Sequence, residues 1–185
     1  MKVLVTGASG FVGSVLCGNL IGRGLTTTGI VRHFPANPLP GVDYQIVSGF
    51  GKSKFWKEIL VGIDVVVHCA ARAHVMRDSE RDPLAAYREV NVEGTRNLAE
   101  QAAGCGIKRF VYISSIKVNG EETNERPFKA DDIPVPEDSY GISKWEAEQV
   151  LQKIGCNSEM EIVIIRPPLV YGPEVRANFL KLMKL

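Results

Sequence analysis

Short apolar runs alternate along the chain with longer stretches in which apolar residues recur at helical spacing. Six runs rich in Val and Ile predict strands at Val3–Val5, Thr27–Val31, Tyr44–Val47, Val65–Cys69, Phe110–Ile113 and Ile162–Ile165. Most of these runs lack polar alternation, which is typical of strands buried on both faces of a parallel sheet. Helices are predicted at Val12–Arg23, Lys52–Leu60, Pro83–Ala103, Ser139–Ile154 and Val175–Leu185. The repeated strand–helix–strand order predicts an α/β fold built on a doubly wound parallel sheet.

Composition and charge narrow the class of protein. A chain of 185 residues suits one domain, and 45% hydrophobic with 23% charged residues is ordinary for a globular protein. The net charge of +1 gives no reason to expect a nucleic-acid or membrane partner. No apolar run reaches the ~18 residues of a membrane helix, and Lys2 leads at once into a strand rather than a signal peptide. We therefore expect a cytoplasmic protein.

The cysteines indicate neither a disulfide framework nor a metal site. They stand far apart, form no CxxC pair and each lies in an apolar-looking stretch, so we expect reduced, structural residues. The histidines show no ligand spacing with them, and no metal is expected. The residues concerned are Cys17, Cys69, Cys105 and Cys156, with His33, His68 and His74.

A glycine-rich turn joins the first strand to the first helix. Its pattern is Gly7-x-x-Gly10-x-x-Gly13. The glycines permit a tight turn, close approach of a pyrophosphate and close packing of the helix, whose N-terminal N–H groups attract phosphate. A glycine turn without a ligand is the alternative, but the strand–turn–helix context favours a dinucleotide and a Rossmann-type fold. The predicted binding residues here are Gly7, Gly10, Phe11, Val12 and Gly13.

The end of the second strand bears on the choice of dinucleotide. An acidic residue there would bind the ribose 2′-hydroxyl of NAD, but the strand ends Gly29-Ile30-Val31-Arg32. An arginine can pair with a 2′-phosphate through its planar fork of donors. Arg32 therefore favours NADP over NAD, with a solvated surface arginine as the alternative.

A tyrosine and a lysine lie one helical turn apart at Tyr140-Gly141-Ile142-Ser143-Lys144. Positions i and i+4 share one face of a helix, so the ammonium is expected near the phenol and should lower its pKa. The tyrosine would then transfer a proton while hydride moves to or from the dinucleotide. Ser114 and Ser115 end the fifth predicted strand, at the edge where open α/β sheets bind ligands. One of these hydroxyls is expected to hold the substrate oxygen, with a serine pair that merely caps the strand as the alternative.

Together, the glycine turn, the serine pair and the Tyr140–Lys144 pair resemble the extended short-chain dehydrogenases/reductases, which include NDP-sugar epimerases, dehydratases and 4-ketoreductases. The resemblance implies that Ser115, Tyr140 and Lys144 are catalytic, that Tyr140 and Lys144 also contact the cofactor, and that Ser114 lies beside the nicotinamide. It further implies cofactor contacts from three later segments. These contacts are Cys69, Ala70 and Ala71 after the fourth strand, Asn91 in a helix, and Pro167 in Arg166-Pro167-Pro168-Leu169-Val170-Tyr171-Gly172.

Details of the sequence resemble one subgroup of this family. The segment Ser114–Gly120, with Asn119 in place of the usual aromatic residue, is similar to bacterial surface-polysaccharide enzymes that include 4-reductases of UDP-linked keto sugars. A net reduction would use NADPH, which agrees with Arg32. Lys117, His74 and Arg72 could then contact the sugar or its pyrophosphate, or lie at the rim of the pocket.

The resemblance predicts an NAD(P)-dependent UDP-sugar 4-epimerase or 4-ketoreductase, with a nucleotide-sugar substrate. Family members are usually much longer, so we expect residues 1–172 to form the NAD(P)-binding domain and residues 173–185 to begin a substrate-binding lobe that is largely missing. Two alternatives remain: a non-catalytic NAD(P)-binding regulator, and a cofactor-binding fragment that is inactive without that lobe. The family also implies a homodimer through the predicted helices Pro83–Ala103 and Ser139–Ile154.

Overall fold

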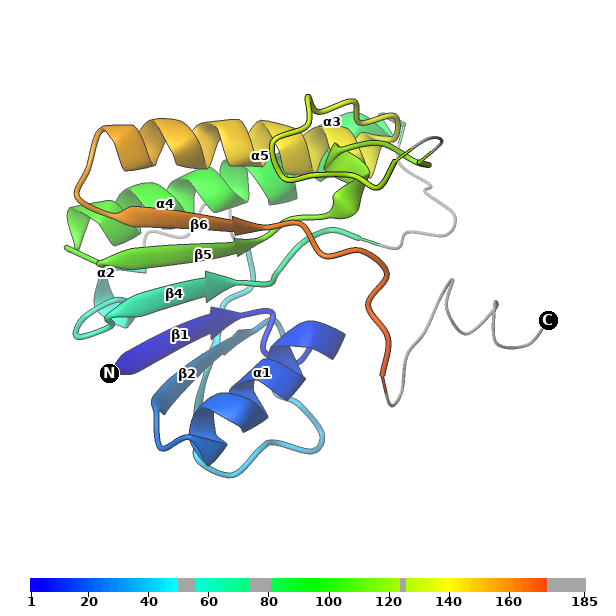
Figure 1. The fold of residues 1–185 in the computed structure, drawn as a ribbon. Coiled ribbons are helices and arrows are strands. Elements are labelled where there is room, and N and C mark those ends of the chain that lie inside the picture. The colour runs from blue at the N-terminus through cyan, green and yellow to red at the C-terminus, as the bar shows by residue number, and fades with distance from the viewer. Residues whose placement is uncertain (50–55, 74–80, 124–125, 173–185) are drawn as a thin grey trace.

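Six parallel strands form one sheet in the order β3-β2-β1-β4-β5-β6 (Figure 1). The computed structural model describes residues 1–49, 56–73, 81–123 and 126–172. From β1 the chain adds β2 and β3 on one side, and then returns to add β4, β5 and β6 on the other side of β1. The strand order therefore reverses between β1 and β4, and the carboxyl ends of these two strands flank the point where such folds bind ligands. The predicted doubly wound sheet is confirmed. Its strands are β1 (Lys2–Thr6), β2 (Thr26–Val31), β3 (Val42–Ile46), β4 (Val65–His68), β5 (Arg109–Ile113) and β6 (Glu161–Ile165).

Helices cover both faces of this sheet. In Figure 1, α1 (Phe11–Gly22) lies in front of β1 and β2, whereas α4 (Gly94–Gly104) and α5 (Ser139–Cys156) lie together on the other face. Val5 and Cys17 belong to the core under α1, and the larger core under α4 and α5 contains Leu98, Phe110 and Leu151. The shorter helices are α2 (Trp56–Ile59), α3 (Pro83–Arg88) and the 3-10 turn η2 (Ile116–Val118).

The long helix predicted at Pro83–Ala103 contains a break in its hydrogen-bonding pattern. It begins as predicted, because the Asp82 side chain caps it by accepting from the N–H of Ala85. A π-helical turn, η1 (Glu89–Glu93), then separates α3 from α4. Such turns widen a helix locally and often occur at functional sites. Residues 52–55 of the helix predicted at Lys52–Leu60 lie outside the described residues, as does the whole helix predicted at Val175–Leu185. The proposed start of the substrate lobe at 173–185 lies outside them too.

All four cysteines are free, but their burial differs from the prediction. Cys17 is buried and Cys69 half-buried, whereas Cys105 and Cys156 are exposed. The latter two follow or end helices α4 and α5, where the chain turns at the surface. Two of the four cysteines predicted to be reduced and structural therefore lie at the surface, although their local sequence is apolar.

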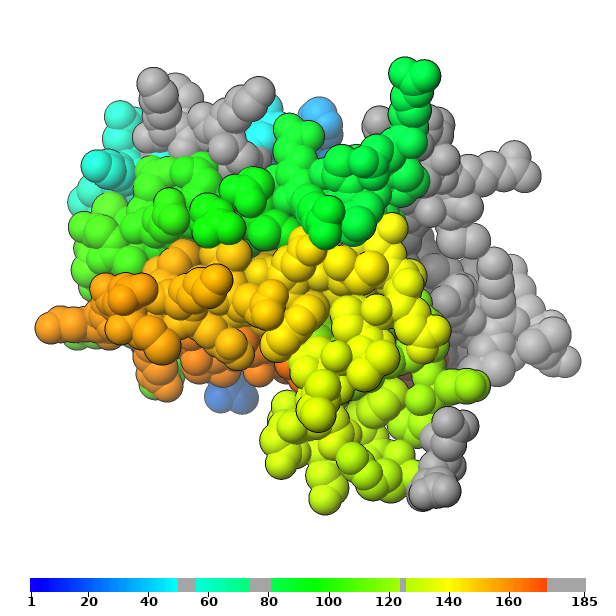
Figure 2. Space-filling view, turned by 90° about the horizontal axis from the view of Figure 1, so that it is seen from above, coloured from blue at the N-terminus to red at the C-terminus, as the bar shows by residue number. Residues whose placement is uncertain are grey.

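Helices α3, α4 and α5 lie side by side on one surface of the molecule (Figure 2). An ion pair joins two of them there, with 2.5 Å between Arg88 Nη2 and Glu146 Oε1. The homodimer through these helices stays a prediction. Within the described ranges, no helix has both the length and the apolar character needed to span a membrane.

Candidate active site

The turn between β1 and α1 requires glycine at two positions. Gly7 has φ 65°, and a Cβ there would lie 2.9 Å from the backbone nitrogen of Ala70. A Cβ at Gly13 would lie 2.2 Å from the carbonyl oxygen of Gly7. Both conflicts involve backbone atoms, which cannot rotate away as a side chain could. The glycines therefore bring α1 and the segment after β4 against the same turn.

The first turn of α1 has hydrogen-bond donors available for an anion. Gly10 is the N-cap residue and supplies no side-chain cap, while the Ser14 N–H donates to the Gly10 carbonyl at 2.9 Å. The N–H groups of Phe11, Val12 and Gly13 therefore head the helix without a side-chain acceptor. This arrangement, with its helix dipole, fits the diphosphate of a dinucleotide.

The end of β2 lies directly beside this turn. The Ala8 N–H donates to the Ile30 carbonyl, with 3.2 Å between nitrogen and oxygen. Val31 is 3% exposed and carries no polar atom in its side chain, while Arg32, the next residue, is exposed. The position at which an acid would bind a ribose is thus apolar, and a guanidinium lies one residue further on.

Ser115, Tyr140 and Lys144 lie at the carboxyl edge of the sheet. Ser115 is the N-cap residue of η2 and follows the end of β5, and Tyr140 and Lys144 lie on the first turns of α5. A hydrogen bond with the Ser115 side chain lowers the pKa of Tyr140. The Tyr140 ring also packs edge-on against Tyr87, with 6.2 Å between ring centroids. Ser115 and Tyr140, two of the three expected catalytic residues, are therefore neighbours at this edge.

The pKa of Tyr140 differs from the expectation. Burial raises it above the ordinary value of 10.0, and the charges of Asp138 and Tyr87 add to this, while Ser115 and Lys117 lower it. The predicted lowering by Lys144 is therefore not what governs this phenol. The basic side chain that lowers its pKa is Lys117 instead.

Lys144 is almost fully buried, at 1% exposure. Its Nζ donates to the Ile113 carbonyl at 2.7 Å and lies 4.0 Å from the centroid of the Tyr112 ring. Burial lowers the pKa of Lys144 from 10.5 to about 7, against an opposing attraction to Glu148. Its charge is held between a carbonyl oxygen and an aromatic face, the partners a buried cation needs.

Asn91 joins the segment after β4 to the catalytic helix. Its side chain accepts from the Arg72 N–H at 2.7 Å and donates to the Arg72 carbonyl at 3.1 Å. It also donates to Ser143 Oγ at 3.0 Å, and Ser143 in turn donates to the Tyr140 carbonyl at 2.8 Å. The π turn thus places the Asn91 amide where it bonds both the segment after β4, at Arg72, and helix α5, at Ser143. Arg72 lies over the Tyr87 ring, 5.4 Å from its centroid, and so near Tyr140.

A buried chain of hydrogen bonds runs from the glycine turn to the π turn. The Thr95 hydroxyl donates to the Asn91 carbonyl at 2.6 Å, so its oxygen accepts from His68 Nε2, 3.0 Å away. His68 Nδ1 then accepts from the Thr6 hydroxyl at 2.6 Å, and Thr6 accepts from the Ala70 N–H at 3.2 Å. This order of donors requires a neutral His68 protonated on Nε2. Burial accordingly lowers its pKa from 6.5 to about 3.

Stability should therefore fall as the pH drops from 6.5 towards 3. In that window His68 binds a proton in the unfolded chain but stays neutral in the folded chain. The free energy of unfolding therefore falls by up to about 1.4 kcal/mol for each pH unit. Urea unfolding at stepped pH measures this slope. His68→Gln should flatten it, and the matched change His33→Gln, at an exposed imidazole, should leave it in place. Equal slopes in all three proteins would contradict the assignment.

The Ser114 hydroxyl is hydrogen-bonded inside the protein and does not face the side on which a ligand would bind. It is 2% exposed and donates to Glu148, with 2.5 Å between Oγ and Oε1. Glu148 is fully buried and pairs with Arg166, with 2.6 Å between Nη2 and Oε2. The Ser114 N–H bonds the Ile165 carbonyl, and the Ile116 N–H bonds the Pro167 carbonyl at 3.1 Å. This network fixes the segment after β6 beside η2.

Sequence reasoning missed three residues of this region. Glu148 and Arg166 form the buried pair, and Asp138 caps α5 by accepting from the Gly141 N–H at 2.6 Å. Asp138 had a signal, since Asp before a periodic helix is a typical N-cap. Glu148 had one too, because it lies one turn beyond Lys144 on the same face. Nothing near Arg166 in the sequence indicates its partner.

Three residues are predicted either to contact the substrate or to lie at the rim of the pocket, and the structure places them differently. Lys117 Nζ lies 2.7 Å from Glu121 Oε1 and 2.7 Å from Asp138 Oδ2, so its ammonium is already paired with two carboxylates. Arg72 lies near Tyr140 through Tyr87, and His74 is outside the described residues. The structure thus gives Lys117 a different set of contacts from the one expected.

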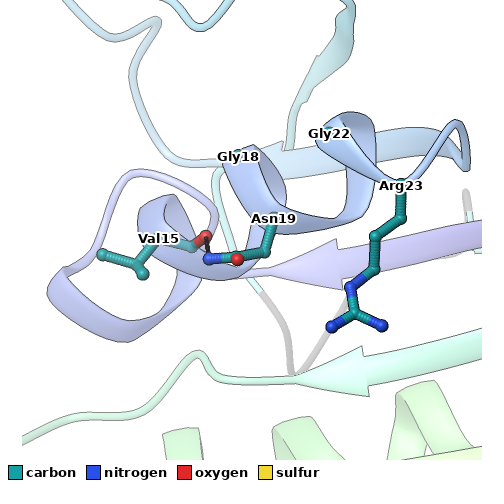
Figure 3. A pocket seen from close by; sticks show the side chains of 5 residues that line it. All are labelled: Val15, Gly18, Asn19, Gly22 and Arg23. Atoms are coloured by element: carbon teal, nitrogen blue, oxygen red, sulfur yellow. Dashed lines mark hydrogen bonds between the residues drawn. The ribbon is translucent and has the colours of Figure 1, made fainter.

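A separate hollow of about 330 Å³ lies along the outer surface of α1 (Figure 3). Val15, Gly18, Asn19, Gly22 and Arg23 line it, and the Asn19 amide donates to the Val15 carbonyl at 2.8 Å. None of these residues belongs to the glycine turn or to the Ser115–Tyr140 contact. The hollow is therefore not part of the candidate active site.

Known proteins are similar to this chain in sequence and in fold. The model of the NAD dependent epimerase/dehydratase family matches residues 3–183. The chain belongs to this family. The UDP-glucose 4-epimerase of Vibrio cholerae is 50% identical to this chain over 100% of the chain and 56% of its own length. An N-acetyl-alpha-D-glucosaminyl-diphospho-ditrans,octacis-undecaprenol 4-epimerase of Escherichia coli O157:H7 is 32% identical over 99% of the chain and 53% of its own length.

Solved structures of the same family share this fold. A UDP-glucuronic acid 4-epimerase from Bacillus cereus, in complex with UDP-glucuronic acid and NAD, has a TM-score of 0.82 and 30% identity, covering 95% of this chain and 59% of that one. The UDP-glucose 4-epimerase of Thermotoga maritima, with UDP-glucose, has a TM-score of 0.84 and 27% identity, covering 94% and 57%. The chain thus spans little more than half the length of these relatives.

Proposed function

We propose that the protein to which this chain belongs is an NAD(P)-dependent enzyme that transfers hydride at C4 of a UDP-sugar, as a 4-epimerase or a 4-ketoreductase. The observation that carries the proposal is the placement of Ser115, before η2, and Tyr140, on the first turn of α5, at the same carboxyl edge of the sheet, one helical turn from the buried Lys144. The Vibrio cholerae relative, a UDP-glucose 4-epimerase by name, supports this substrate class. The Escherichia coli relative, whose named substrate is a sugar linked to undecaprenyl diphosphate, supports the reaction at C4 but not the UDP group. A role in surface-polysaccharide synthesis belongs to the same proposal.

The residues of this chain would hold the cofactor at the glycine turn and along the edge of the sheet. Gly7, Gly10 and Gly13 leave room at the turn, and the N–H groups that head α1 fit a diphosphate. Cys69, Ala70 and Ala71 follow β4 on the other side of the switch point. Asn91 is bonded to Arg72 in the same segment, Ser114 follows β5, and Pro167 is bonded to η2 through its carbonyl. Bound NAD(P) supplies the acceptor and donor of hydride.

The proton chemistry belongs to the protein. In the proposed reaction, Tyr140 takes the proton of the C4 hydroxyl on oxidation and returns it on reduction, and Ser115 holds that oxygen by a hydrogen bond. Lys144 would supply a positive charge on α5, and it anchors this helix to the end of β5 because its Nζ donates to the Ile113 carbonyl. A half-buried phenol beside the Tyr87 ring suits such a transfer, because part of its surface is shielded from water.

The cofactor distinguishes the two forms of the proposal. An epimerase returns the hydride that it takes and retains its cofactor, whereas a reductase must bind NADPH from solution. The NAD in the Bacillus cereus structure supports the first form. The exposed Arg32 beside the glycine turn, with the apolar Val31 in place of an acid, favours NADP and the second form.

We expect NADPH to bind about tenfold more tightly than NADH, a difference of about 1.4 kcal/mol. Titration of the purified chain with each nucleotide measures this, after any retained nucleotide has been identified. Arg32→Ala should remove the preference, and the matched change Arg23→Ala, at an exposed arginine at the far end of α1, should preserve it. Tightly retained NAD would instead overturn the Arg32 argument and favour the epimerase.

The same titration tests the two remaining alternatives. A non-catalytic regulator would bind a nucleotide without needing the Tyr140–Lys144 pair, and the presence of this pair argues against that function. If neither nucleotide binds, the chain alone lacks a working cofactor site and the longer protein must be assayed. If a nucleotide binds but no UDP-sugar reacts, the chain behaves as the inactive cofactor-binding fragment.

A further inference from the structure

We propose that Lys117 and Asp138 are positioning residues of this site, whose ion pair holds the Ser115 turn against the start of α5 and balances the charge around the Tyr140 phenol. The proposal rests on the function proposed above, in which Tyr140 transfers the proton. It assigns to Lys117 a role in arranging the catalytic pair, in place of contact with the substrate.

The first support is the way in which η2 docks on α5. Asp138 is bound at both oxygens: Oδ1 accepts from the Gly141 N–H at 2.6 Å, and Oδ2 lies 2.7 Å from Lys117 Nζ. One carboxylate therefore joins the N-cap of the tyrosine helix to the turn that carries Ser115. Ser115 belongs to the same unit, since its Oγ accepts from the Lys117 N–H at 3.2 Å.

Gly141 shows how closely these two segments approach. A Cβ at this position would lie 2.8 Å from the Lys117 carbonyl oxygen and 3.2 Å from Asp138 Oδ1. A side chain at Gly141 would therefore push η2 away from α5 and separate Ser115 from Tyr140. Backbone contact and ion pair thus act at the same junction, directly beside the catalytic phenol.

The second support is the set of groups that face Tyr140 from each neighbouring element. Ser115 and Lys117 on η2 lower its pKa, while Asp138 before α5 and Tyr87 on α3 raise it. Lys117 and Asp138 are thus partners of opposite sign, and each offsets the effect of the other on the phenol. Lys144, one turn further along α5, is turned towards the Ile113 carbonyl and the Tyr112 ring.

The test depends on breaking the same ion pair from each side. Lys117→Gln leaves the Asp138 carboxylate uncompensated and should shift the titration of Tyr140 to higher pH. Asp138→Asn keeps an N-cap for α5, since Asn is as good a cap as Asp, and should shift it to lower pH. The double variant should return close to the parent protein. A purely structural role would make the two single variants change in the same direction and the double variant the worst of the three.

The readout is the ultraviolet absorbance of the Tyr140 phenolate against pH, taken as the difference between each protein and the same protein carrying Tyr140→Phe. Because it needs no turnover, it still reports on the ion pair if the proposed reaction is wrong. Glu121→Gln is the matched control: it removes the other carboxylate on Lys117, which does not act on Tyr140, and should cause no shift. The two opposite shifts should shrink at high salt, because Lys117 and Asp138 are 36% and 42% exposed.

Each outcome decides the matter. Opposite shifts that cancel in the double variant support the proposal. The proposal is overturned if both single variants shift the titration of Tyr140 in the same direction, or if Asp138→Asn causes no shift. If Lys117→Gln fails to fold, the result for Asp138→Asn decides by itself. If the shifts are opposite but Tyr140→Phe retains full turnover, the electrostatic assignment stands and the proposed function fails instead.

Discussion

Replacing Tyr140 with phenylalanine should lower the turnover of a UDP-sugar by about 10²–10⁴-fold, the usual contribution of a general acid or base. The substitution removes one oxygen, the one that bonds Ser115, and keeps the ring that packs against Tyr87. The fold and the glycine turn should therefore be unaffected. We expect the affinity for the nicotinamide nucleotide to stay unchanged while the rate collapses.

The measurement is steady-state turnover of the full-length protein with a UDP-sugar, beside a nucleotide titration of the same preparation. Tyr44→Phe is the matched control, because it removes a phenol from β3, the opposite edge strand of the sheet, where the hydroxyl accepts from the Leu39 N–H. Its turnover should match that of the parent. Retained activity in Tyr140→Phe would remove this residue from the mechanism, and a parallel loss of nucleotide binding would indicate a structural rather than a chemical role.

A single methyl group at Gly13 should abolish nucleotide binding and destabilise the fold. In Gly13→Ala the new Cβ would lie 2.2 Å from the Gly7 carbonyl oxygen and 2.8 Å from its carbonyl carbon. Relief requires α1 to move away from the turn, which takes the N–H groups at its start out of position. We expect nucleotide affinity to fall more than 100-fold, about 2.7 kcal/mol, and the free energy of unfolding to fall by about 3 kcal/mol.

Gly18→Ala is the matched control for this prediction. It makes the same substitution on the same helix, at a position where a Cβ meets no atom within 4 Å. Alanine is favoured over glycine in a helix, so this variant should be more stable by up to about 1 kcal/mol and bind the nucleotide normally. Urea unfolding and nucleotide titration of both variants give the comparison. Similar behaviour of the two would show that packing at Gly13 is not what the turn requires.

Much of the fold could be predicted because its signals are local. Six apolar runs, the glycine turn and the helices between them follow from residues within about ten positions of each other. All six strands formed, with ends shifted by a residue or two, as at β3, which begins at Val42 rather than Tyr44. The spacing of Tyr140 and Lys144 similarly placed both on one helix. Helical periodicity could not reveal the π turn at Asn91, because there the Asn91 carbonyl bonds the Thr95 hydroxyl, and Thr95 in turn bonds the distant His68.

By itself, therefore, the sequence determined the doubly wound sheet and the glycine turn between β1 and α1, and it predicted the set of Ser115, Tyr140 and Lys144 that the structure places at the carboxyl edge of the sheet. Only the tertiary structure decided how that set is held. It buried Lys144 against Ile113, paired Glu148 with Arg166, and turned Lys117 from an expected substrate contact into the partner of Asp138. The physical reason is distance along the chain. Thr6 and His68 are 62 positions apart, and Asn91 and Ser143 are 52 apart. Such contacts depend on how strands and helices pack, and no local pattern of residues encodes them.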